Sequence, residues 1–411
     1  MNAQGEIPSF NGDEKAKATD FANYFCAYSQ IYHQKSMLSD HQRMAAYHSA
    51  ILGNQDVFRD KVVMDIGTGS GILSVWAAQA GARKVYAIEY TDMAKHAEKV
   101  MKANNVDHIV TVLQTAVEDV KLPIESDQLL VEEDGTERCV DIIISEWMGY
   151  MLLRESMMDS VIHARDRFLK QKTGLMFPSH TTMLLAPITD EEERKHAATD
   201  FSNAMADWND FEQTTNTMYG VDMSILAPDY EREQKEYYML SSRWTELPPE
   251  AVLAEPAVIK RYDMMTCTLQ QAKGLFASDP ESSFDFEIEG SKVQGPVSGF
   301  SGWFTADFCS RTDHGGVDAP KLHHPAFLST GPENGYTHWG QQTFYFLSSI
   351  PTMKGETTRI SGGIEMTRTK DNSRLYNCRF SYSSSRRKSD EPKNGAVLMK
   401  SGVIENVYQI P

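Results

Sequence analysis

The sequence predicts two structural units: a parallel, doubly wound α/β sheet followed by an antiparallel β domain. The 411 residues exceed the usual size of a single hydrophobic core, so more than one unit is expected. Between residues 57 and 167, short apolar runs alternate with helical stretches, which is the pattern of a parallel sheet with covering helices. After residue 178 the pattern changes to segments in which every second residue is apolar, as in antiparallel strands.

The first half contains four predicted strands with helices between them. In chain order we expect a strand at residues 61–67, a helix at 71–82, a strand at 84–89, a helix at 91–105, a strand at 108–117 and a strand at 139–147. Gly81 is placed to end the first of these helices. The run CVDIIISEW has an uninterrupted apolar centre, which is typical of a strand that is covered on both faces.

The second half alternates with a period of two. Three segments carry apolar side chains on one face: Phe284, Phe286 and Ile288 in the first, Phe304, Ala306 and Phe308 in the second, and Tyr376, Cys378, Phe380 and Tyr382 in the third. Turns rich in Gly, Pro and Ser separate these segments, which indicates a sandwich or a barrel. The change of rhythm near Pro178 is the predicted domain boundary.

Residues 190–228 differ in character from both halves. Ala198, Phe201, Met205 and Trp208 recur there at helical spacing among many charged residues. Taken alone, this pattern favours an amphipathic helix that packs on the core of its own domain. The alternative is a projecting arm whose aromatic side chains are buried in a second subunit.

Composition excludes several classes of protein. No run approaches the roughly 20 apolar residues of a membrane span. The first 20 residues lack the basic and apolar regions of a secretory signal, so we expect a short flexible tail there. The five cysteines are scattered and never spaced as CxxC, which argues against a disulfide framework and a zinc site. This usage favours a reducing compartment, the cytosol or the nucleus.

The chain is acidic, with 57 acidic and 40 basic residues and a formal net charge of -17. Such a surface repels nucleic acid, whose binding depends on neutralising phosphates. It would attract basic partners, although a role in solubility alone is the alternative interpretation. We therefore expect neither a nucleic acid nor a membrane as a direct partner.

A glycine-rich loop follows the first predicted strand and opens the first helix. Residues 65–71, which begin with Asp65, have the pattern GxGxG, in which Gly67 and Gly69 let the backbone turn sharply and approach a ligand. Glu89 closes the second strand, where a carboxylate can bind ribose hydroxyls. Glu118 ends the third strand, in position to meet an adenine edge.

The loop has neither the GxGxxG of dinucleotide enzymes nor the GxxxxGK[ST] of nucleotide triphosphatases. A smaller adenosyl ligand, S-adenosylmethionine, is therefore the first hypothesis, and NAD is the second.

Two glutamates follow the fourth predicted strand, at the edge of a parallel sheet where ligands bind. Gly149, midway between them, permits a tight hairpin that would bring Glu146 and Glu155 together. Two converging carboxylates suit a planar guanidinium group, which they bind through bidentate, charge-assisted hydrogen bonds. Without such a partner, two like charges that close would oppose each other.

Four separated motifs together resemble the protein arginine methyltransferases along nearly the whole chain. They are YFxxY from Tyr24 to Tyr28, the loop at residues 65–71, the double-glutamate hairpin, and the THW loop at residues 337–339. The segments YFCAYSQIYHQKSMLSD and THWGQQTF are most similar to the corresponding segments of a plant member of the family. The resemblance implies methyl transfer from S-adenosyl-L-methionine to protein arginine, with S-adenosyl-L-homocysteine as the second product and no metal.

The resemblance also implies a fold and a division of the chain. It implies a flexible tail at residues 1–20, a Rossmann-like S-adenosylmethionine domain at 21–177, a β-barrel substrate domain at 178–411, and an inserted dimerisation arm at 190–228. The arm would dock on the cofactor domain of a second subunit and form a head-to-tail homodimer.

The resemblance assigns cofactor contacts residue by residue. The implied cofactor-binding residues are Tyr24, Tyr28, Gln34, Met37, Arg43, Asp65, Gly67, Gly69, Glu89, Val117 and Glu118. Among them, Arg43 would pair with the methionine carboxylate, Glu89 with the ribose, and Val117 with Glu118 would meet the adenine.

Catalytic roles are implied for four residues. Glu146 and Glu155 would hold the substrate arginine, and His338 would pair with Asp40 to tie the N-terminal helix to the barrel. The carboxylates would concentrate the guanidinium charge on one nitrogen and free lone-pair density on the other. Either Glu155 or the His338–Asp40 pair would accept the proton, and the sequence leaves this choice open.

Substrate and product specificity would depend on Met37, Met157 and Trp339. The two methionines match those that mark type I members, which make monomethylarginine and asymmetric dimethylarginine. Basic proteins such as histone tails and Arg/Gly-rich proteins are the expected substrates.

Two departures from the family pattern are visible: Gln34 stands where many members carry His, and the loop at residues 123–138 is longer and more acidic than usual. That loop either projects into solvent or recruits basic substrates.

Three other functions compete with this prediction. A small-molecule methyltransferase would share the glycine-rich loop but would not need paired glutamates together with a barrel. A nicotinamide dehydrogenase would explain the sheet and Glu89 but would leave the paired glutamates unused. A catalytically silent scaffold would bind arginine-rich tails without methylating them, and the intact Arg43, Glu146 and Glu155 argue against it.

Overall fold

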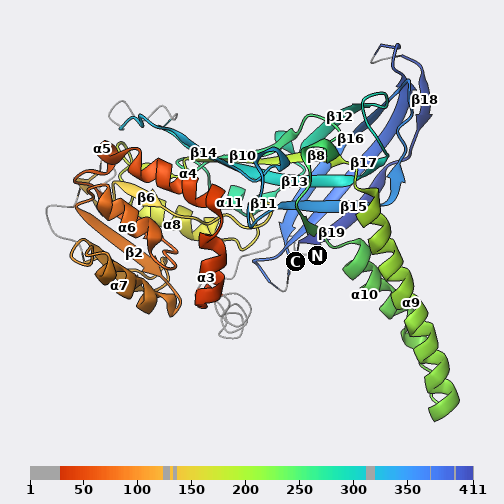
Figure 1. Ribbon diagram of the computed structural model, residues 1–411, viewed down its shortest axis with the longest axis horizontal. Coiled ribbons are helices and arrows are strands. Elements are labelled where there is room, and N and C mark those ends of the chain that lie inside the picture. The colour runs from red at the N-terminus through yellow and green to blue at the C-terminus, as the bar shows by residue number, and fades with distance from the viewer. Residues whose placement is uncertain are drawn as a thin grey trace.

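The computed structural model describes residues 28–123, 130–132, 137–311, 320–370, 372–392 and 395–410. The predicted tail at residues 1–20, Tyr24 and most of the acidic loop lie outside the described residues. Figure 1 shows an α/β unit beside an elongated antiparallel β unit, from which a pair of helices projects. This arrangement confirms the predicted fold class.

The first unit is a five-stranded parallel sheet with helices on its faces. Its strands are β1 (Val62–Ile66), β2 (Lys84–Glu89), β3 (Val110–Gln114), β6 (Ile142–Ile144) and β7 (Leu175–Phe177). Its helices are α3 (Ile31–Leu38), α4 (His41–Leu52), α5 (Gln55–Phe58), α6 (Ile72–Gln79), α7 (Met93–Ala103) and α8 (Met158–Phe168). All five residues of β1 are buried, which explains the continuous apolar run at this position.

The strand order places a ligand crevice beside β1. The sheet runs β3-β2-β1-β6-β7, so the chain leaves β1 toward β2 on one side and returns to β6 on the other. Parallel sheets bind ligands where the order reverses in this way, outside the carboxyl ends of the strands. The sequence did not predict β7, because its three residues are too short to show a periodic pattern.

The acidic loop before β6 is anchored at its base. β4 (Leu130–Val131) and β5 (Glu137–Arg138) pair as a short antiparallel ladder. Arg138 donates to the backbone oxygen of Asp166 at 2.6 Å, and Glu132 accepts from the backbone N–H of Gln171 at 2.9 Å.

The second unit consists of two antiparallel sheets. One contains β8 (His180–Ile188), β9 (Arg243–Thr245), β10 (Ala257–Asp263), β13 (Val297–Phe308), β14 (Ala326–Ser329) and β15 (Gln341–Ile350). The other contains β11 (Gly274–Leu275), β12 (Ser283–Glu289), β16 (Glu356–Arg368), β17 (Tyr376–Lys388), β18 (Val397–Lys400) and β19 (Ile404–Ile410). Its short helices are α11 (Leu269–Ala272), η4 (Pro249–Ala251), η5 (Pro280–Ser282) and η6 (Pro332–Asn334).

Aromatic side chains join the two sheets. Phe300 on β13 lies 4.9 Å from Phe284, 5.3 Å from Phe380 and 5.4 Å from Tyr382, measured between ring centroids. The apolar faces that the period of two predicted on β12, β13 and β17 are all buried. They include Phe286, Phe304 and Phe380, one from each strand.

Backbone hydrogen bonds close one seam between the sheets, from Ser242 N–H to Gln409 oxygen at 2.7 Å and from Gln409 N–H to Leu240 oxygen at 2.9 Å. The two packed sheets are thus joined along one edge, and this unit is called the barrel below.

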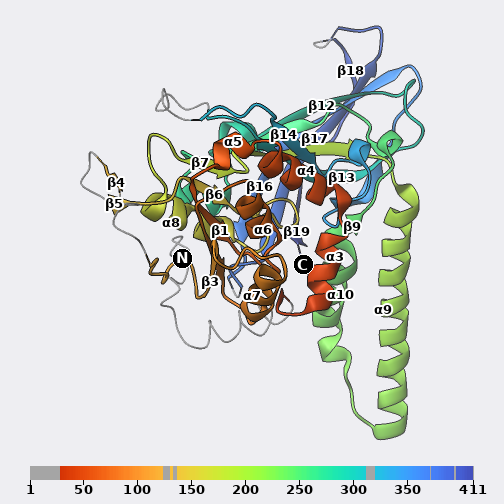
Figure 2. The ribbon, with the colours of Figure 1, turned by 60° about the vertical axis from the view of Figure 1, so that its left-hand side comes forward.

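Two long helices project from this barrel, α9 (Glu191–Tyr219) and α10 (Ala227–Met239), linked by η3 (Ser224–Leu226). Asp190 caps α9 by accepting from the N–H of Glu193, and Gly220, in the left-handed conformation, ends it. The two helices run side by side away from both sheets (Figures 1 and 2). Among the residues of α9, Ala197 is buried. This helix therefore does not pack on the core of its own domain, which is the arrangement that the sequence pattern alone favours. The helical segment also continues past residue 228, to Met239.

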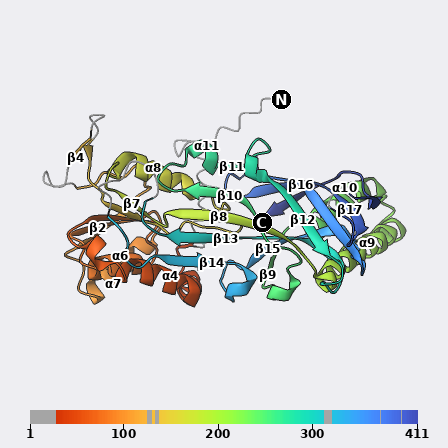
Figure 3. The same ribbon diagram turned by 90° about the horizontal axis from the view of Figure 1, so that it is seen from above.

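The two units lie next to each other (Figure 3), and side chains of α8 tie them together. Arg368 on β16 makes a bidentate ion pair with Asp159 on α8, at 2.8 and 2.9 Å. Arg165 on α8 donates to the backbone oxygens of Met264 and Cys267, at 2.9 and 2.7 Å. In the described part of the chain, no helix combines the length and apolarity needed to cross a bilayer.

Candidate active site

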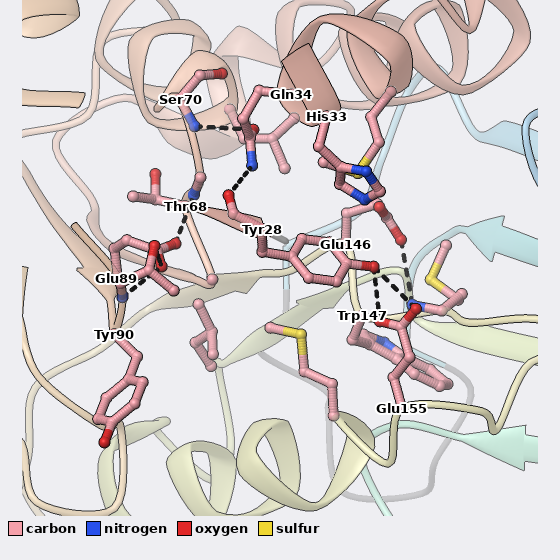
Figure 4. Close-up of a pocket in the computed structure, with 18 of the residues that line it drawn as sticks. Tyr28, His33, Gln34, Thr68, Ser70, Glu89, Tyr90, Glu146, Trp147 and Glu155 are labelled. Carbon is pink, nitrogen blue, oxygen red and sulfur yellow. Dashed lines mark hydrogen bonds between the residues drawn. The ribbon is translucent and has the colours of Figure 1, made fainter. Parts of the chain in front are cut away.

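A cavity of about 610 Å³ lies at the carboxyl ends of β1, β2 and β6. The glycine-rich loop, α3, the double-glutamate hairpin and the THW loop all line it, so both domains contribute (Figure 4). This volume is typical of a site for a small molecule or cofactor. The cavity therefore lies at the crevice beside β1 where the strand order predicts a ligand.

The glycine-rich loop is closely packed against two cavity side chains. Gly67 and Gly69 have φ of 69° and 54°, in the left-handed region that favours glycine. A Cβ on Gly67 would lie 2.3 Å from Met157 Cε, and one on Gly69 would lie 2.7 Å from Gln34 Oε1. Gln34 also accepts from the N–H of Ser70 at 3.2 Å, which ties α3 to the loop.

Asp65 supports this loop from below. It is fully buried and accepts from the hydroxyls of Thr68 at 2.6 Å and Ser74 at 2.7 Å. Burial raises the pKa of Asp65 to about 6, against the opposing effect of these two hydroxyls. Asp65 does not line the cavity. A role of Asp65 in cofactor binding stays a prediction, and it would act through the loop that its side chain holds.

Two acidic residues follow neighbouring strands. Glu89 ends β2 and accepts from the N–H of Gly69 at 2.9 Å and from the N–H and hydroxyl of Thr91 at 2.8 and 2.7 Å. β3 ends at Gln114, so Glu118 lies in the loop after it and not at the strand end that the sequence predicted. Glu118 accepts from the hydroxyl of Ser160 at 2.6 Å, and Val117 lies beside it in the cavity wall. Both acids thus line the same cavity, where an adenosyl group could lie between them.

The double-glutamate hairpin turns as predicted. A Cβ on Gly149 would lie 2.0 Å from the backbone oxygen of Arg154, so only glycine fits where the two arms meet. Met151, Leu152, Glu155 and Ser156 all have positive φ. Such conformations cost free energy in residues other than glycine and cluster at functional sites.

Glu146 is held by Arg43, whose Nη2 and Nε lie 2.8 and 3.0 Å from its Oε2. The N–H of Met148 donates to the other carboxylate oxygen at 3.2 Å. Arg43 also donates to the backbone oxygen of Met37 at 3.2 Å. The sequence did not predict the Arg43–Glu146 pair, and the assignment of Arg43 to a cofactor carboxylate stays a prediction.

Glu155 is held by Tyr28, whose hydroxyl lies 2.8 and 2.9 Å from the two carboxylate oxygens. Figure 4 shows this hydroxyl directed at Glu155, on the side of the cavity where Glu146 also lies. The loop after β16 fixes the backbone of Glu155, because its N–H donates to the oxygen of Arg374 at 2.8 Å and Arg374 donates back to the Glu155 oxygen at 2.7 Å.

Asp40 and His338 join the α/β unit to the barrel. Asp40 is buried at the start of α4, where it accepts from the N–H of Arg43 at 3.0 Å. Its other oxygen accepts from the N–H of His338 at 2.9 Å and lies 2.7 Å from His338 Nδ1. Burial acts to raise the pKa of Asp40, but the hydrogen bonds from His338 and Arg43 outweigh it and lower this pKa.

Comparisons with known proteins find methyltransferases, most of them arginine methyltransferases. The model described as "Arginine methyltransferase oligomerization subdomain" matches residues 181–387, and that of "Ribosomal protein L11 methyltransferase (PrmA)" matches residues 50–152. Protein arginine N-methyltransferase PRMT10 of rice, Oryza sativa subsp. japonica, is 45% identical over 368 residues, which cover 89% of this chain and 88% of the rice protein. PRMT10 of Arabidopsis thaliana is 44% identical and covers 87% and 86%.

The chain belongs to the protein arginine N-methyltransferase family.

Solved structures of two arginine methyltransferases share its architecture. Arabidopsis protein arginine methyltransferase 10, in a conformation described as uniquely open, has a TM-score of 0.80 and 39% identity, covering 94% of this chain and all of that one. The Trypanosoma brucei PRMT1 enzyme–prozyme heterotetrameric complex with AdoHcy has a TM-score of 0.65 and 25% identity, over 94% and 100%.

The residues expected to set specificity in this methyltransferase all line the cavity. Met37 lies on α3, and Met157 approaches Gly67 from the start of α8. Trp339 is buried and donates from Nε1 to the backbone oxygen of Met148 at 2.8 Å, so the THW loop braces the hairpin. Their roles in specificity stay predictions.

Sequence reasoning missed part of the cavity wall of this methyltransferase. The additional lining residues that it did not single out include Tyr150, Arg154, Trp244, Tyr336 and Arg374. Arg154 could have been noticed, because it directly precedes Glu155 in the hairpin. The others come from turns and short strands without a periodic signal. In the part of the chain that the structure describes, no group of three or more His, Cys, Asp or Glu could hold a metal ion.

Proposed function

We propose that this arginine methyltransferase transfers methyl groups from S-adenosyl-L-methionine to guanidino nitrogens of arginine in basic proteins and is a type I enzyme. The observation that best supports this proposal is the position of Glu146 and Glu155 in one cavity with the glycine-rich loop. Two carboxylates on one side of an adenosyl site suit a guanidinium group brought to a methyl donor.

S-adenosylmethionine fits the described residues, and S-adenosylhomocysteine would be the released product. Gly67 and Gly69 allow close approach of the backbone, Glu89 stands where ribose hydroxyls bind, and Glu118 with Val117 lines the wall suited to adenine. The match of a methyltransferase model to residues 50–152 and the AdoHcy in the trypanosome complex support this choice. When bound, the cofactor supplies a methyl group on a positively charged sulfonium.

The glutamates would prepare the substrate guanidinium. Arginine is a poor nucleophile because its pKa is at least about 12 and its charge is delocalised. Glu155 and Glu146 would hold the charge toward one terminal nitrogen, so that lone-pair density remains on the other. Glu155 or the Asp40–His338 pair would accept the proton that leaves.

Type I chemistry requires room for a second methyl group on the same nitrogen. Met37 and Met157, both in the cavity wall, are the residues that we assign to this selection. Monomethylarginine and asymmetric dimethylarginine are the products that we expect, with Trp339 holding the hairpin in place.

Histone tails and Arg/Gly-rich proteins are the substrates that we propose. The net charge of -17 supports this choice, because it would raise the encounter rate of basic chains. A cytoplasmic or nuclear location is proposed with it, supported by free cysteines at Cys139, Cys267, Cys309 and Cys378.

A homodimer through α9 and α10 completes the proposal. The end of this arm carries exposed apolar side chains, among them Met218, Tyr219 and Ile225. Such a patch is unusual on a monomer and is typical of a protein contact. The arm of each copy would dock on the cofactor domain of the other, which gives a closed, two-fold dimer.

The decisive experiment incubates the full chain with S-adenosylmethionine and an arginine–glycine peptide and analyses the peptide by mass spectrometry. Fragmentation distinguishes asymmetric from symmetric dimethylarginine. Peptide that stays unmodified would favour the silent scaffold, and a symmetric product would remove the type I assignment. A thermal shift with S-adenosylhomocysteine but not with NAD would separate the methyltransferase from a dehydrogenase.

The first prediction concerns Glu155. We expect Glu155→Gln to lower kcat by about 100- to 1000-fold, because an amide cannot hold the guanidinium charge. The thermal shift with S-adenosylhomocysteine should persist. Glu405→Gln, an exposed position on β19, is the matched control and should keep wild-type turnover. Undiminished turnover of Glu155→Gln would remove Glu155 from the mechanism.

A further inference from the structure

We propose that the cavity mouth contains a subsite for the residues that flank the target arginine, and that it selects acidic or neutral flanks against basic ones. The subsite is formed by Arg154, Tyr150, Trp244 and Tyr336, all of which line the cavity. The inference rests on the proposed function, since it concerns the substrate of the same site.

Arg154 carries the argument, because part of its guanidinium is held without a hydrogen-bond partner. Its Nε is buried and has no partner among the described residues. The guanidinium lies 5.3 Å above the ring of Tyr150, a cation–π contact that fixes its position. Buried donors in folded proteins almost always have a partner. The side chain is 23% exposed, and this exposed part is available to a carboxylate or carbonyl oxygen of a bound polypeptide.

Two half-exposed aromatic rings continue this wall. Trp244 and Tyr336 are 43% and 52% exposed, and their ring centroids lie 6.5 Å apart. Trp244 donates from Nε1 to the backbone oxygen of His338 at 3.1 Å, and a Cβ on Gly340 would lie 2.6 Å from its indole. The tryptophan is thus fixed before any substrate arrives. Rigid aromatic rings with a free face are typical anchors for a polypeptide.

Arg154 places a positive charge in the cavity wall of an acidic chain, directly beside Glu155. Arg154 Nη1 lies 3.6 Å from Glu155 Oε1, so a target guanidinium must pass close to Arg154 to reach this carboxylate. A second cation beside the target arginine would meet the charge of Arg154 at short range. The net charge of -17 acts at longer range, where salt screens it beyond about 8 Å. The net negative charge of the chain would therefore speed the encounter with basic substrates. Arg154 at the cavity mouth would discriminate between the residues that flank the target arginine.

The test compares three peptides with one central arginine, flanked on both sides by glutamate, glycine or lysine. For each peptide, kcat/KM is measured with the wild type, Arg154→Gln and Arg154→Lys. We expect the ratio of kcat/KM for the glutamate peptide to that for the lysine peptide to fall about fivefold in Arg154→Gln, as for the loss of one charge contact of roughly 1 kcal/mol. The glycine peptide reports any general effect on turnover.

The variants and controls separate charge from hydrogen bonding and from folding. Arg154→Lys keeps the charge and should retain most of the discrimination against lysine, while losing affinity for the glutamate peptide. Arg359→Gln removes an exposed ion pair with Asp285 on the barrel and should leave the ratio unchanged. A ratio that changes less than about twofold in Arg154→Gln, or rises, would overturn the subsite. If the wild type methylates none of the peptides, the proposed function fails first, and the subsite falls with it.

Discussion

Each of the two glutamates is oriented within the chain before a substrate binds. Arg43 holds Glu146 at 2.8 Å, and Tyr28 holds Glu155 through both carboxylate oxygens. These contacts restrict the rotation of both carboxylates. Catalysis by fixed charges is efficient because little reorganisation remains for the moment of reaction. The pairs also explain how two acids can share a cavity without repelling each other strongly.

Asp65, which holds the glycine-rich loop, lowers the free energy of unfolding when its carboxylate is ionised. Its carboxylate is fully buried, and Oδ1 has no hydrogen-bond partner among the described residues. A pKa of about 6 in the folded protein, against an ordinary value of 3.8, corresponds to about 3 kcal/mol less stability when Asp65 is ionised. The hydroxyls of Thr68 and Ser74 need this acceptor, so the same group that shapes the loop destabilises the fold at neutral pH.

The second prediction follows from the sign of this shift. Because the pKa is raised, the folded protein binds the proton more tightly than the unfolded chain, and stability is lost as pH rises from about 4 through about 6. Relative to Asp65→Asn, the wild type should gain about 1 kcal/mol between pH 7.5 and pH 5. Urea unfolding at several pH values, without cofactor, measures this difference. Asp207→Asn, exposed on α9, is the control, and parallel curves for wild type and Asp65→Asn would contradict the argument.

Among the elements, the double-glutamate hairpin is the most constrained. It reverses direction within a few residues, with a backbone hydrogen bond from Gly149 N–H to Leu152 oxygen at 3.0 Å. Trp339 and the loop at Arg374 brace it from the barrel side. The strain of its positive-φ residues is thus opposed by contacts from the other domain.

The third prediction tests this constraint. Gly149→Ala would force a Cβ to within 2.0 Å of the Arg154 oxygen, so the hairpin must open and the two glutamates must separate. We expect turnover to fall by at least about tenfold, with a loss of stability of about 1–3 kcal/mol. Gly402→Ala is the matched control, because a Cβ there meets nothing within 4 Å. Equal turnover in both variants would show that the hairpin tolerates a change that its geometry forbids.

The sequence predicted those elements whose patterns are long. The period of two over residues 374–382 and the apolar centre of residues 139–147 identified β17 and β6. β7 escaped because its three apolar residues stand alone between Gly174 and Pro178, whereas Cys139 and Val140 lengthen the apolar pattern of β6. The arm is different: a helical pattern records which side chains share a face, but not whether that face meets the helix's own domain. Its projection is set by tertiary structure, which periodicity does not encode.

The site was predictable where motifs are contiguous and less so where it depends on distant contacts. Local sequence predicted the turn at Gly149 and the loop at Gly67. The Asp40–His338 contact joins residues 298 positions apart and was expected only from the family resemblance. The motif alone does not show which of its residues reach the cavity: Gly67 and Gly69 line it, whereas Asp65 is buried and does not.

At the scale of the molecule, the cavity exists only while both domains stay in contact. The α/β unit supplies the glycine-rich loop and the hairpin, and the barrel supplies Trp339, His338 and the loop at Arg374. The Arg368–Asp159 pair and the donations from Arg165 hold the two units in this relation. Protein substrates would therefore enter along the junction, where the rim residues of both domains meet.

In the proposed homodimer the arm would extend this organisation beyond one chain, and its tip provides the fourth prediction. Ile225 is 81% exposed between α9 and α10, near the exposed Met218 and Tyr219 at the end of α9, and such a group of apolar side chains is typical of a protein contact. We expect Ile225→Arg to dissociate the proposed homodimer, because an interface buries apolar side chains at its centre and excludes unpaired charge. Light scattering after size exclusion measures the mass. Val403→Arg, a 71% exposed position between β18 and β19, should keep the dimer. A wild type that is monomeric at all concentrations, or an Ile225→Arg variant that stays dimeric, would contradict the role of the arm tip in assembly.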